Sequence, residues 1–220
     1  AARRAPGARK SVAAWKALMH PNRAFEWTDE AEMLHFAEEQ SFAHIFTAAS
    51  GQLFAVHAPV VVVDGRIQFH VSRRNRIVDH VVGNAVLISV LGRHAYQSAN
   101  WYASENQVPT WHYEAVEIEG VAREMTAEEL VCFLDRLSDI NERRVQPEMP
   151  WTRAKMEPAK FEALTRAIIG FEVEPSAIRG TRKFNQHKDG EDLAATIEGQ
   201  QSAGRGDIVA AIRELKGADE

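Results

Sequence analysis

Polar side chains with phosphate-binding chemistry stand together at one point of the chain, in the run HVSRRN. Ser72 supplies a hydroxyl group, and three nitrogen donors follow it in order: Arg73, Arg74 and Asn75. Guanidinium groups bind phosphate oxygens in pairs, and the N-terminus of a following helix would add backbone N–H groups. The run therefore predicts a phosphate site, although charged residues after a strand are also typical of an ordinary solvated surface.

A β-hairpin leads into this run. Asp64-Gly65 separates LFAVHAPVVVV from RIQFHVS and is a strong signal for a two-residue turn. Such a turn fixes the register and predicts three facing pairs: His57 with Ser72, Pro59 with His70, and Val61 with Gln68. The polar residues then share an outer face, and the alternate residues, which are apolar, line the core.

Two histidines on the outer face raise the alternative of a metal site. In the expected register His57 and His70 lie diagonally to one another. Neither a third ligand nor an HExxH helix accompanies them. We therefore predict no metal and include both histidines among the residues around a bound cofactor.

The elements that position these residues alternate between helix and strand patterns. A helix is predicted over 28–40 with Thr28 as its N-cap, and another over 126–144, which opens with the capping box Thr126-Ala-Glu-Glu129. A third covers 157–168, with Pro158 in its first turn. A short helix is expected over 74–83, and strands over 41–48, 53–63, 66–72, 85–92, 94–98, 111–124 and 169–178. Six or more antiparallel strands can close a small barrel, so we expect an α+β fold.

Composition limits the class of protein. The formal net charge of −5 gives no overall positive field for nucleic acid. The single Cys132 lies in the apolar run LVCFL, where we expect it to pack as a small hydrophobic residue. One cysteine makes no intramolecular disulfide, which indicates a reducing, cytoplasmic setting. No apolar run reaches the roughly 18 residues of a membrane-spanning helix.

The two ends of the chain differ from its middle. Residues 1–18 are basic and rich in Ala, and we expect a flexible extension there. We expect one folded domain over 19–188 and a helical tail over 189–220. The sequence contains no convincing helix-turn-helix, zinc finger or long basic helix. Contact with DNA would therefore depend on scattered basic residues: Arg3, Arg4, Arg9, Lys10, Arg143 and Arg144.

Six segments together resemble the PaiB-type FMN-binding negative regulators of transcription, whose fold is the flavin-binding split β-barrel shared with pyridoxamine phosphate oxidases. Between Met19 and about Lys188 they occur in the family's order: FAVHAPVVV, HVSRRN, GRHAYQSANWY, VPTWHYEAVEIEG, IIGFEVE and KFNQHK. The most specific is GRHAYQSANWY followed by VPTWHY. The resemblance thus implies an antiparallel split β-barrel with peripheral helices.

The resemblance also implies a homodimer with FMN in the groove between two barrels. In the family the HVSRRN region supplies phosphate-binding groups, which nominates Ser72, Arg73 and Arg74. The VPTWHY strand and a late lysine-glutamine pair would approach the flavin, partly from the other subunit, and this nominates Trp111, His112, Lys183 and Gln186. The aromatic residues of GRHAYQSANWY are expected to form a wall along the groove and the subunit seam.

Three functions remain open. One is a negative regulator of transcription, acting directly or through a partner. Another is a flavin-dependent oxidoreductase that accepts a hydride from a small substrate or nicotinamide, with His57 and His112 near the ring. A third is an interaction module without cofactor, because the chain departs from the family's Asn-Pro-Gln at Asn75-Arg76-Ile77 and from its Asn at His187.

Overall fold

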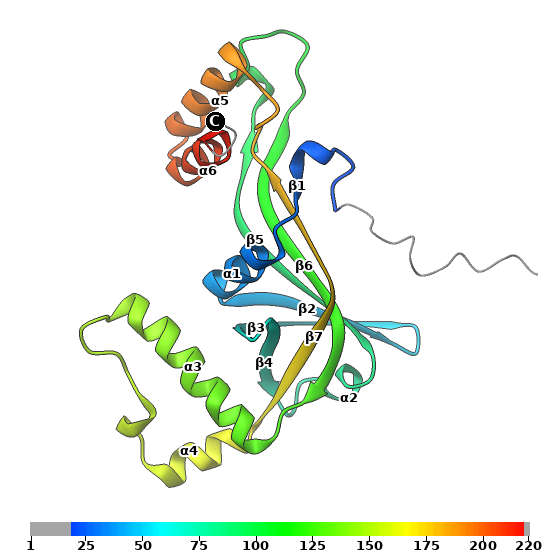
Figure 1. Ribbon diagram of the computed structural model, residues 1–220, viewed down its shortest axis with the longest axis vertical. Helices are drawn as coiled ribbons and strands as arrows, with labels where there is room; N and C mark the ends of the chain where they lie inside the picture. Colours follow the sequence, from blue (N-terminus) through cyan, green and yellow to red (C-terminus); the bar gives the residue numbers. More distant parts are fainter. Residues whose placement is uncertain (1–18, 218–220) are drawn as a thin grey trace, which may run out of the picture.

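Seven strands form one antiparallel sheet that closes on itself (Figure 1). The computed structural model describes residues 19–217. The strand order is β1-β7-β4-β3-β2-β5-β6, and β6 also pairs with β7, which closes a six-stranded barrel with β1 added at the edge. The strands are β1 (Glu26–Trp27), β2 (Phe42–Ala49), β3 (Gln52–Val63), β4 (Arg66–Ser72), β5 (Ala85–Gln97), β6 (Thr110–Glu124) and β7 (Ile168–Lys183).

Helices flank the barrel and cap one end of the sheet (Figure 1). The α-helices are α1 (Glu30–Gln40), α2 (Val78–Val81), α3 (Ala127–Val145), α4 (Pro158–Thr165), α5 (Gly190–Ser202) and α6 (Gly206–Gly217). The part of the chain that the structure describes also has three short 3₁₀ helices, η2 (Arg23–Phe25), η3 (Ala99–Trp101) and η4 (Arg153–Lys155). The predicted α+β class is confirmed.

Two local helix signals had different outcomes. The capping box at Thr126 is present, because its hydroxyl accepts from the Glu129 N–H and the Glu129 carboxylate accepts from the Thr126 N–H. The expected cap of α1 is wrong: Asp29 caps it, accepting from the Glu32 N–H at 2.9 Å. A carboxylate at this place also complements the helix dipole, which a hydroxyl does not.

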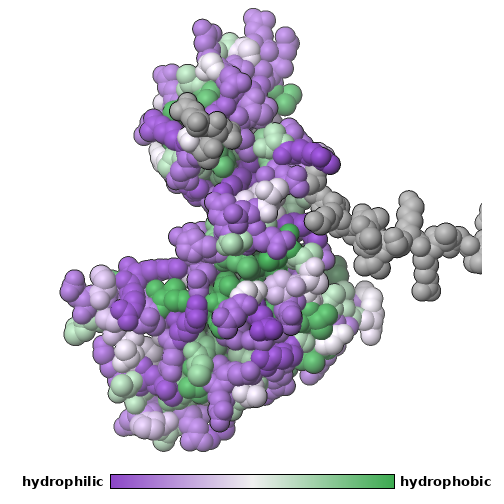
Figure 2. All heavy atoms as spheres, viewed as in Figure 1, coloured by the Kyte–Doolittle hydropathy of each residue, from purple (hydrophilic) through white to green (hydrophobic). Residues whose placement is uncertain are grey.

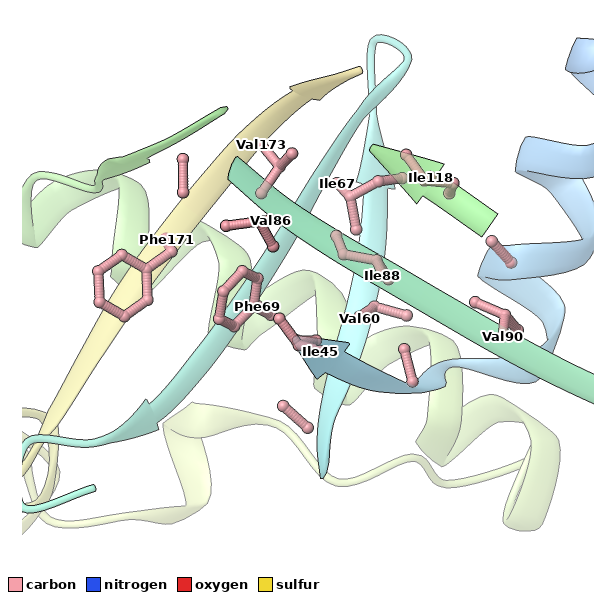
Figure 3. Packing of buried hydrophobic residues seen from close by; sticks show 14 of the residues in the cluster. Ile45, Val60, Ile67, Phe69, Val86, Ile88, Val90, Ile118, Phe171 and Val173 are labelled. Atoms are coloured by element: carbon pink, nitrogen blue, oxygen red, sulfur yellow. The ribbon is translucent and has the colours of Figure 1, made fainter. Parts of the chain in front are cut away.

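The barrel interior is filled by the apolar face of the strands, as the alternation predicted. Figure 3 shows side chains from β2 to β7 packed together. The residues that it labels are all buried: Ile45, Val60, Ile67, Phe69, Val86, Ile88, Val90, Ile118, Phe171 and Val173. The polar residues of the same strands are therefore directed to the outer surface of the barrel.

The hairpin turn is confirmed. Asp64 and Gly65 both have positive φ, 50° and 78°, as a type I′ turn requires. Val61 faces Gln68 as predicted. The ladder between β3 and β4 then ends, one pair further, at Val60.

The other two facing pairs of the hairpin are wrong. Residues 52–59 of β3 pair with β2, so that Pro59 faces Phe42 and His57 faces His44. His70 and Ser72 pair with β7 on the other edge of β4. A curled sheet lets the two halves of one long strand pair with different neighbours, and a hairpin register therefore cannot be extended along the whole strand.

The segments 85–92 and 94–98, expected as two strands, form the single strand β5. Its register against β6 shifts between Leu91 and His94, so the break in the sequence pattern is an irregularity within one strand. Gly92 stands at this point, where a Cβ would lie 2.7 Å from the Phe36 ring and 2.8 Å from the Glu114 side chain. Only glycine fits this close approach.

The outer ends of β5, β6 and β7 extend from the barrel as an arm, which α5 and α6 cap (Figure 1). The strand expected over 169–178 continues to Lys183 and so forms part of this arm. A second hydrophobic cluster holds the two helices on the arm: Ala95, Phe184, Ile208, Ala211 and Ile212. The molecule therefore has a barrel and a smaller upper lobe joined by three continuous strands.

Further expectations concern the surface and the chain ends. Cys132 is exposed on α3, so its expected packing is wrong; the apolar stripe of the helix turns Phe133 inward instead. Between residues 19 and 217 no helix is long and apolar enough to span a membrane. The basic extension 1–18, including Arg3, Arg4, Arg9 and Lys10, lies outside the described residues.

Candidate functional site

Residues 72–75, which we call the phosphate ledge, form a tight turn directly after β4. The Asn75 N–H donates to the Ser72 carbonyl at 2.9 Å, and the Arg74 N–H donates to the Ser72 hydroxyl oxygen at 3.3 Å. Ser72, Arg73 and Arg74 are all exposed. Because the Ser72 oxygen acts as acceptor in the turn, its own hydrogen is directed elsewhere and is available to a ligand.

Arg73 is held in place by the chain that enters β7. Its N–H donates to the Ala167 carbonyl at 3.0 Å, and its side-chain Nε donates to the Arg166 carbonyl at 3.1 Å. Both bonds leave the two Nη groups of this exposed side chain without a partner among residues 19–217. A guanidinium fixed through Nε and open at Nη suits a phosphate with two oxygens in reach.

The positions that depart from the family pattern are accommodated structurally. The Asn75 side chain accepts from the Ile77 N–H at 3.1 Å, and Ile77 is fully buried. Arg76 lies with its guanidinium carbon 5.6 Å from the centre of the Phe54 ring. The following α2 has only four residues. It is therefore too short to add the N-terminal anion site that we expected.

Helix α3 covers the outer face of the β3–β4 hairpin. Gln68 is buried there and donates to Glu172 at 2.7 Å, and His70 packs edge-on against Phe133, with ring centres 5.5 Å apart. Burial lowers the pKa of His70, and its Nδ1 atom is buried with no partner. Both side chains lie on the outer face as predicted, but under a helix instead of facing a ligand.

His57 lies against a histidine that sequence reasoning missed. Its ring is 4.7 Å from that of His44, edge to face, on the exposed side of β2 and β3. Residues 19–217 contain no group of three His, Cys, Asp or Glu side chains that could hold a metal ion. The alternation in FAHIFTA could have placed His44 on the outer face of its strand. Pairing it with His57 also required the β2–β3 register, which the sequence does not give.

The second set of nominated residues lies on the arm. Trp111 is exposed and meets Tyr96 edge to face, with ring centres 6.0 Å apart. Lys183 donates from Nζ to the Thr110 hydroxyl at 2.7 Å, and partial burial lowers its pKa. Trp111 and Tyr96 thus form an exposed aromatic surface, which suits stacking on a flat ring.

His112 is fully buried beneath α5. Its Nε2 lies 3.0 Å from the Gln97 side-chain oxygen, which also accepts from Gln200 at 3.2 Å. The Gln97 amide nitrogen donates to the Ser98 carbonyl, so its oxygen must accept and His112 must donate from Nε2. Burial, with a smaller contribution from the Lys183 charge, lowers the pKa of His112 to about 4. His112 is therefore neutral at pH 7 and is shielded from a ligand.

The late glutamine stabilises the chain locally. Gln186 accepts from the Phe184 N–H at 2.8 Å and donates to the carbonyls of Arg182 and Ala24. All polar atoms of this amide are thus engaged. The adjacent His187 packs edge-on against Phe25, with ring centres 5.1 Å apart.

The ledge and the arm residues stand at opposite ends of β7. Ser72 pairs with Ile168, and Lys183 pairs with Tyr113. The strand has 16 residues, which at about 3.3 Å each span roughly 50 Å. One FMN molecule is shorter than this, so both sets cannot contact the same FMN within one chain.

The expected aromatic wall is only partly formed within one chain. Trp101 packs against Gly199 of α5, and the Tyr102 hydroxyl accepts from Asn185 at 2.9 Å. His94 is exposed, and Tyr96 joins Trp111 on the arm. GRHAYQSANWY therefore divides its rings between the seat of α5 and the exposed aromatic surface.

Apolar side chains also gather on the outer face of β2, β3 and β5, which we call the apolar face. Figure 2 shows that hydrophobic residues collect on the barrel, whereas the upper lobe is mostly hydrophilic on the side in view. Leu53 is 81% exposed, and other exposed members are Phe42, Phe46 and Leu91. An exposed apolar patch of this kind is typical of an interaction surface.

Comparison with known proteins identifies the family. The family model described as "Putative FMN-binding domain" matches residues 19–177. The chain belongs to this family. It is also 27% identical over 194 residues to "Protease synthase and sporulation protein PAI 2" of Bacillus subtilis (strain 168), covering 84% of this chain and 90% of that protein. The resemblance to PaiB-type proteins is therefore confirmed.

Solved structures agree on the fold. The FAD and heme binding protein of Mycobacterium smegmatis matches with a TM-score of 0.56 at 15% identity, over 77% of this chain and 79% of that one. The flavocytochrome Anf3 of Azotobacter vinelandii matches with a TM-score of 0.54 at 15% identity, over 74% and 72%. The split-barrel architecture is confirmed by these neighbours.

The FMN-binding domain match covers the ledge and the β6 residues but ends before the end of β7. The ledge, Trp111 and His112 lie inside 19–177, whereas Lys183 and Gln186 follow it. Sequence reasoning missed the carbonyls of Arg166 and Ala167, because backbone atoms carry no residue-type signal. It also missed the exposure of Phe42 and Phe46, which the strand pattern alone does not reveal.

Proposed function

We propose that this chain binds FMN in a groove between two barrels of a homodimer and, in that form, acts as a negative regulator of transcription. The observation that carries the proposal is the phosphate ledge, in which the exposed Arg73 is fixed through Nε and open at both Nη atoms. Family membership favours FMN among flavins.

The donor set fits the phosphate of FMN. Ser72 offers a hydroxyl hydrogen, and Arg73 and Arg74 offer exposed guanidinium groups on one turn. Charge-assisted hydrogen bonds to a phosphate are about twice as strong as neutral ones. The ledge would hold the phosphate, and FMN when bound would supply a ring that can exchange electrons with a donor.

A dimer is supported by the distance between the two nominated sets. Roughly 50 Å of β7 separates the ledge from Lys183, so an FMN on the ledge would meet the arm residues only of a second copy. The apolar face offers a surface that a second copy can cover. In such an assembly the ring would stack beside Trp111 and Tyr96 of the other subunit.

Regulation through a partner protein is favoured over direct contact of α3 with DNA. Arg143 pairs with Asp139 at 2.7 Å, and Arg144 donates to the Glu39 carbonyl and the Ser41 hydroxyl. Arg144 is thus engaged in attaching α3 to the end of α1. A helix with its basic side chains so engaged has few free cations for a phosphate backbone.

The test combines an absorption spectrum with light scattering, with and without added FMN. We expect flavin bands that co-elute with a mass of two chains. A colourless monomer that ignores FMN would contradict the proposal. Rapid bleaching by NADH or NADPH with reoxidation in air would instead favour the oxidoreductase, and resistance to both donors favours the regulator.

A further inference from the structure

A cavity of about 340 Å³ lies between α3 and the segment that returns from it to β7. In Figure 1 this segment leaves the end of α3 and comes back through α4. Three parts of the chain line the cavity: α3, the stretch from Trp151 to Thr165, and the entry into β7 at Ala167 and Ile168. None of the ledge residues 72–75 and none of the exposed residues of the apolar face lines it.

The lining is mostly apolar and carries no unpaired charge. Its apolar members are Leu134, Trp151, Met156, Phe161, Leu164, Ala167 and Ile168. The two charged members, Asp135 and Arg153, pair with each other at 3.0 Å, and the Arg153 guanidinium also lies 5.0 Å from the centre of the Phe161 ring. The Thr165 hydroxyl donates to the Phe161 carbonyl. Ser138 is the remaining polar group.

These properties select a class of occupant. Small-molecule pockets typically have volumes of about 300–1,000 Å³ and are lined by apolar and aromatic side chains with few polar groups. A volume near the lower limit fits a small molecule and is too small for a docked helix. Because Asp135 and Arg153 neutralise one another, a charged ligand would lose hydration without a free partner. Trp151 and Phe161 favour a flat ring.

The cavity shares its wall with the ledge. Ala167 lines the cavity, and its carbonyl accepts a hydrogen bond from the Arg73 N–H. The adjacent Arg166 carbonyl accepts from Arg73 Nε. An occupant that orders this part of the chain would therefore also fix the two acceptors that orient Arg73. If the first ligand orders this segment, the second ligand loses less conformational entropy when it binds. The two ligands then strengthen each other's binding.

We propose that this cavity binds a small, neutral, ring-containing apolar molecule, and that its occupation strengthens FMN binding through Arg166 and Ala167. The coupling rests on the proposed function, but the cavity itself does not. The natural ligand is defined here by its chemical class: an uncharged, flat and largely apolar molecule.

The probe for the cavity is N-phenyl-1-naphthylamine, a neutral aromatic fluorophore, titrated into the full chain without FMN. We expect saturable fluorescence enhancement that Leu164→Asp weakens at least tenfold, because the new carboxylate enters the apolar lining. Leu164 is 55% exposed, so this variant should fold. The matched control is Ala163→Asp, which puts the same charge on the preceding residue of α4, which is exposed and lies outside the lining. Circular dichroism checks the fold of both variants.

Equal titrations of the wild type and Leu164→Asp, or no saturable signal, would overturn the cavity as a ligand site.

For the coupling, equilibrium dialysis measures FMN binding with and without saturating probe. We expect FMN to bind about fivefold more tightly with the probe, and the probe to bind more tightly with FMN by the same factor. An unchanged FMN affinity would overturn the coupling. If FMN binds under neither condition, the proposed function and the coupling fail together, while the probe titration still decides the cavity.

Discussion

Arg73 is the residue on which the phosphate proposal depends most directly. Arg73→Ala should weaken FMN binding about tenfold or more, because a charge-assisted hydrogen bond is lost while the ledge backbone is unchanged. Equilibrium dialysis measures the affinity, and circular dichroism checks the fold.

The neighbouring Arg166 provides the matched control for Arg73. Its side chain pairs with Glu162 at 2.6 Å, and only its backbone carbonyl contacts Arg73. Arg166→Ala removes the same charge from the same part of the surface and should leave FMN affinity nearly unchanged. Equal losses in the two variants would mean that the ledge acts only through its general positive field.

His112 should make the stability of the fold depend on pH. Its pKa is lowered to about 4 in the folded chain, whereas in the unfolded chain it is near 6.5. Between these values only the unfolded state takes up the proton, so stability falls as the pH decreases from about 6.5 to 4. The full loss below pH 4 is roughly 3 kcal/mol.

Urea denaturation across this pH range checks the prediction. His112→Gln keeps a side-chain N–H donor for Gln97 and has no proton to gain. As the pH decreases, the unfolding free energy of this variant should fall less steeply than that of the wild type. The difference in slope corresponds to the uptake of at most one proton on unfolding. His94→Gln, at an exposed position, is the control and should keep the wild-type slope. The same slope in all three proteins would contradict the prediction.

At the scale of elements, α3 depends on its N-terminal capping box. Thr126→Ala removes the hydroxyl that accepts from the Glu129 N–H, and we expect a loss of about 1 kcal/mol in the free energy of unfolding. Thr126→Ser retains the hydroxyl and should lose much less. Urea denaturation followed by circular dichroism separates the two, and equal stability of both variants would show that the cap is not used.

The same scale explains which elements the sequence predicted well. The Asp64-Gly65 turn and the α3 cap depend on residues close in sequence, so their patterns are sufficient. The pairing of His57 depends on the curvature of the whole sheet, and the unity of β5 depends on Gly92 fitting against Phe36 of α1. Such long-range conditions leave no local signature.

At the scale of the whole molecule, the apolar face should join two chains. Phe46→Lys adds a charge at an exposed position of β2 that a monomer tolerates. We expect light scattering to give the mass of one chain, and FMN affinity to fall because the arm of the partner is lost. Val145→Lys, at an exposed apolar residue at the end of α3, is the control and should remain dimeric. An unchanged mass for Phe46→Lys would contradict this interface.

The sequence by itself determined the α+β class and most strand and helix positions, because these follow from periodicity and turn residues. It also placed the polar cluster at 72–75 and carried the motifs by which the chain resembles its family. Only the tertiary structure decided which nominated side chains are exposed and which are covered. His70 and His112 have suitable side chains, but α3 and α5 cover them. Likewise, the length of β7 separates Ser72 from Lys183. The burial of these histidines and the distance between Ser72 and Lys183 both depend on how helices and strands pack. That packing involves residues far apart in the sequence, so no local pattern predicts it.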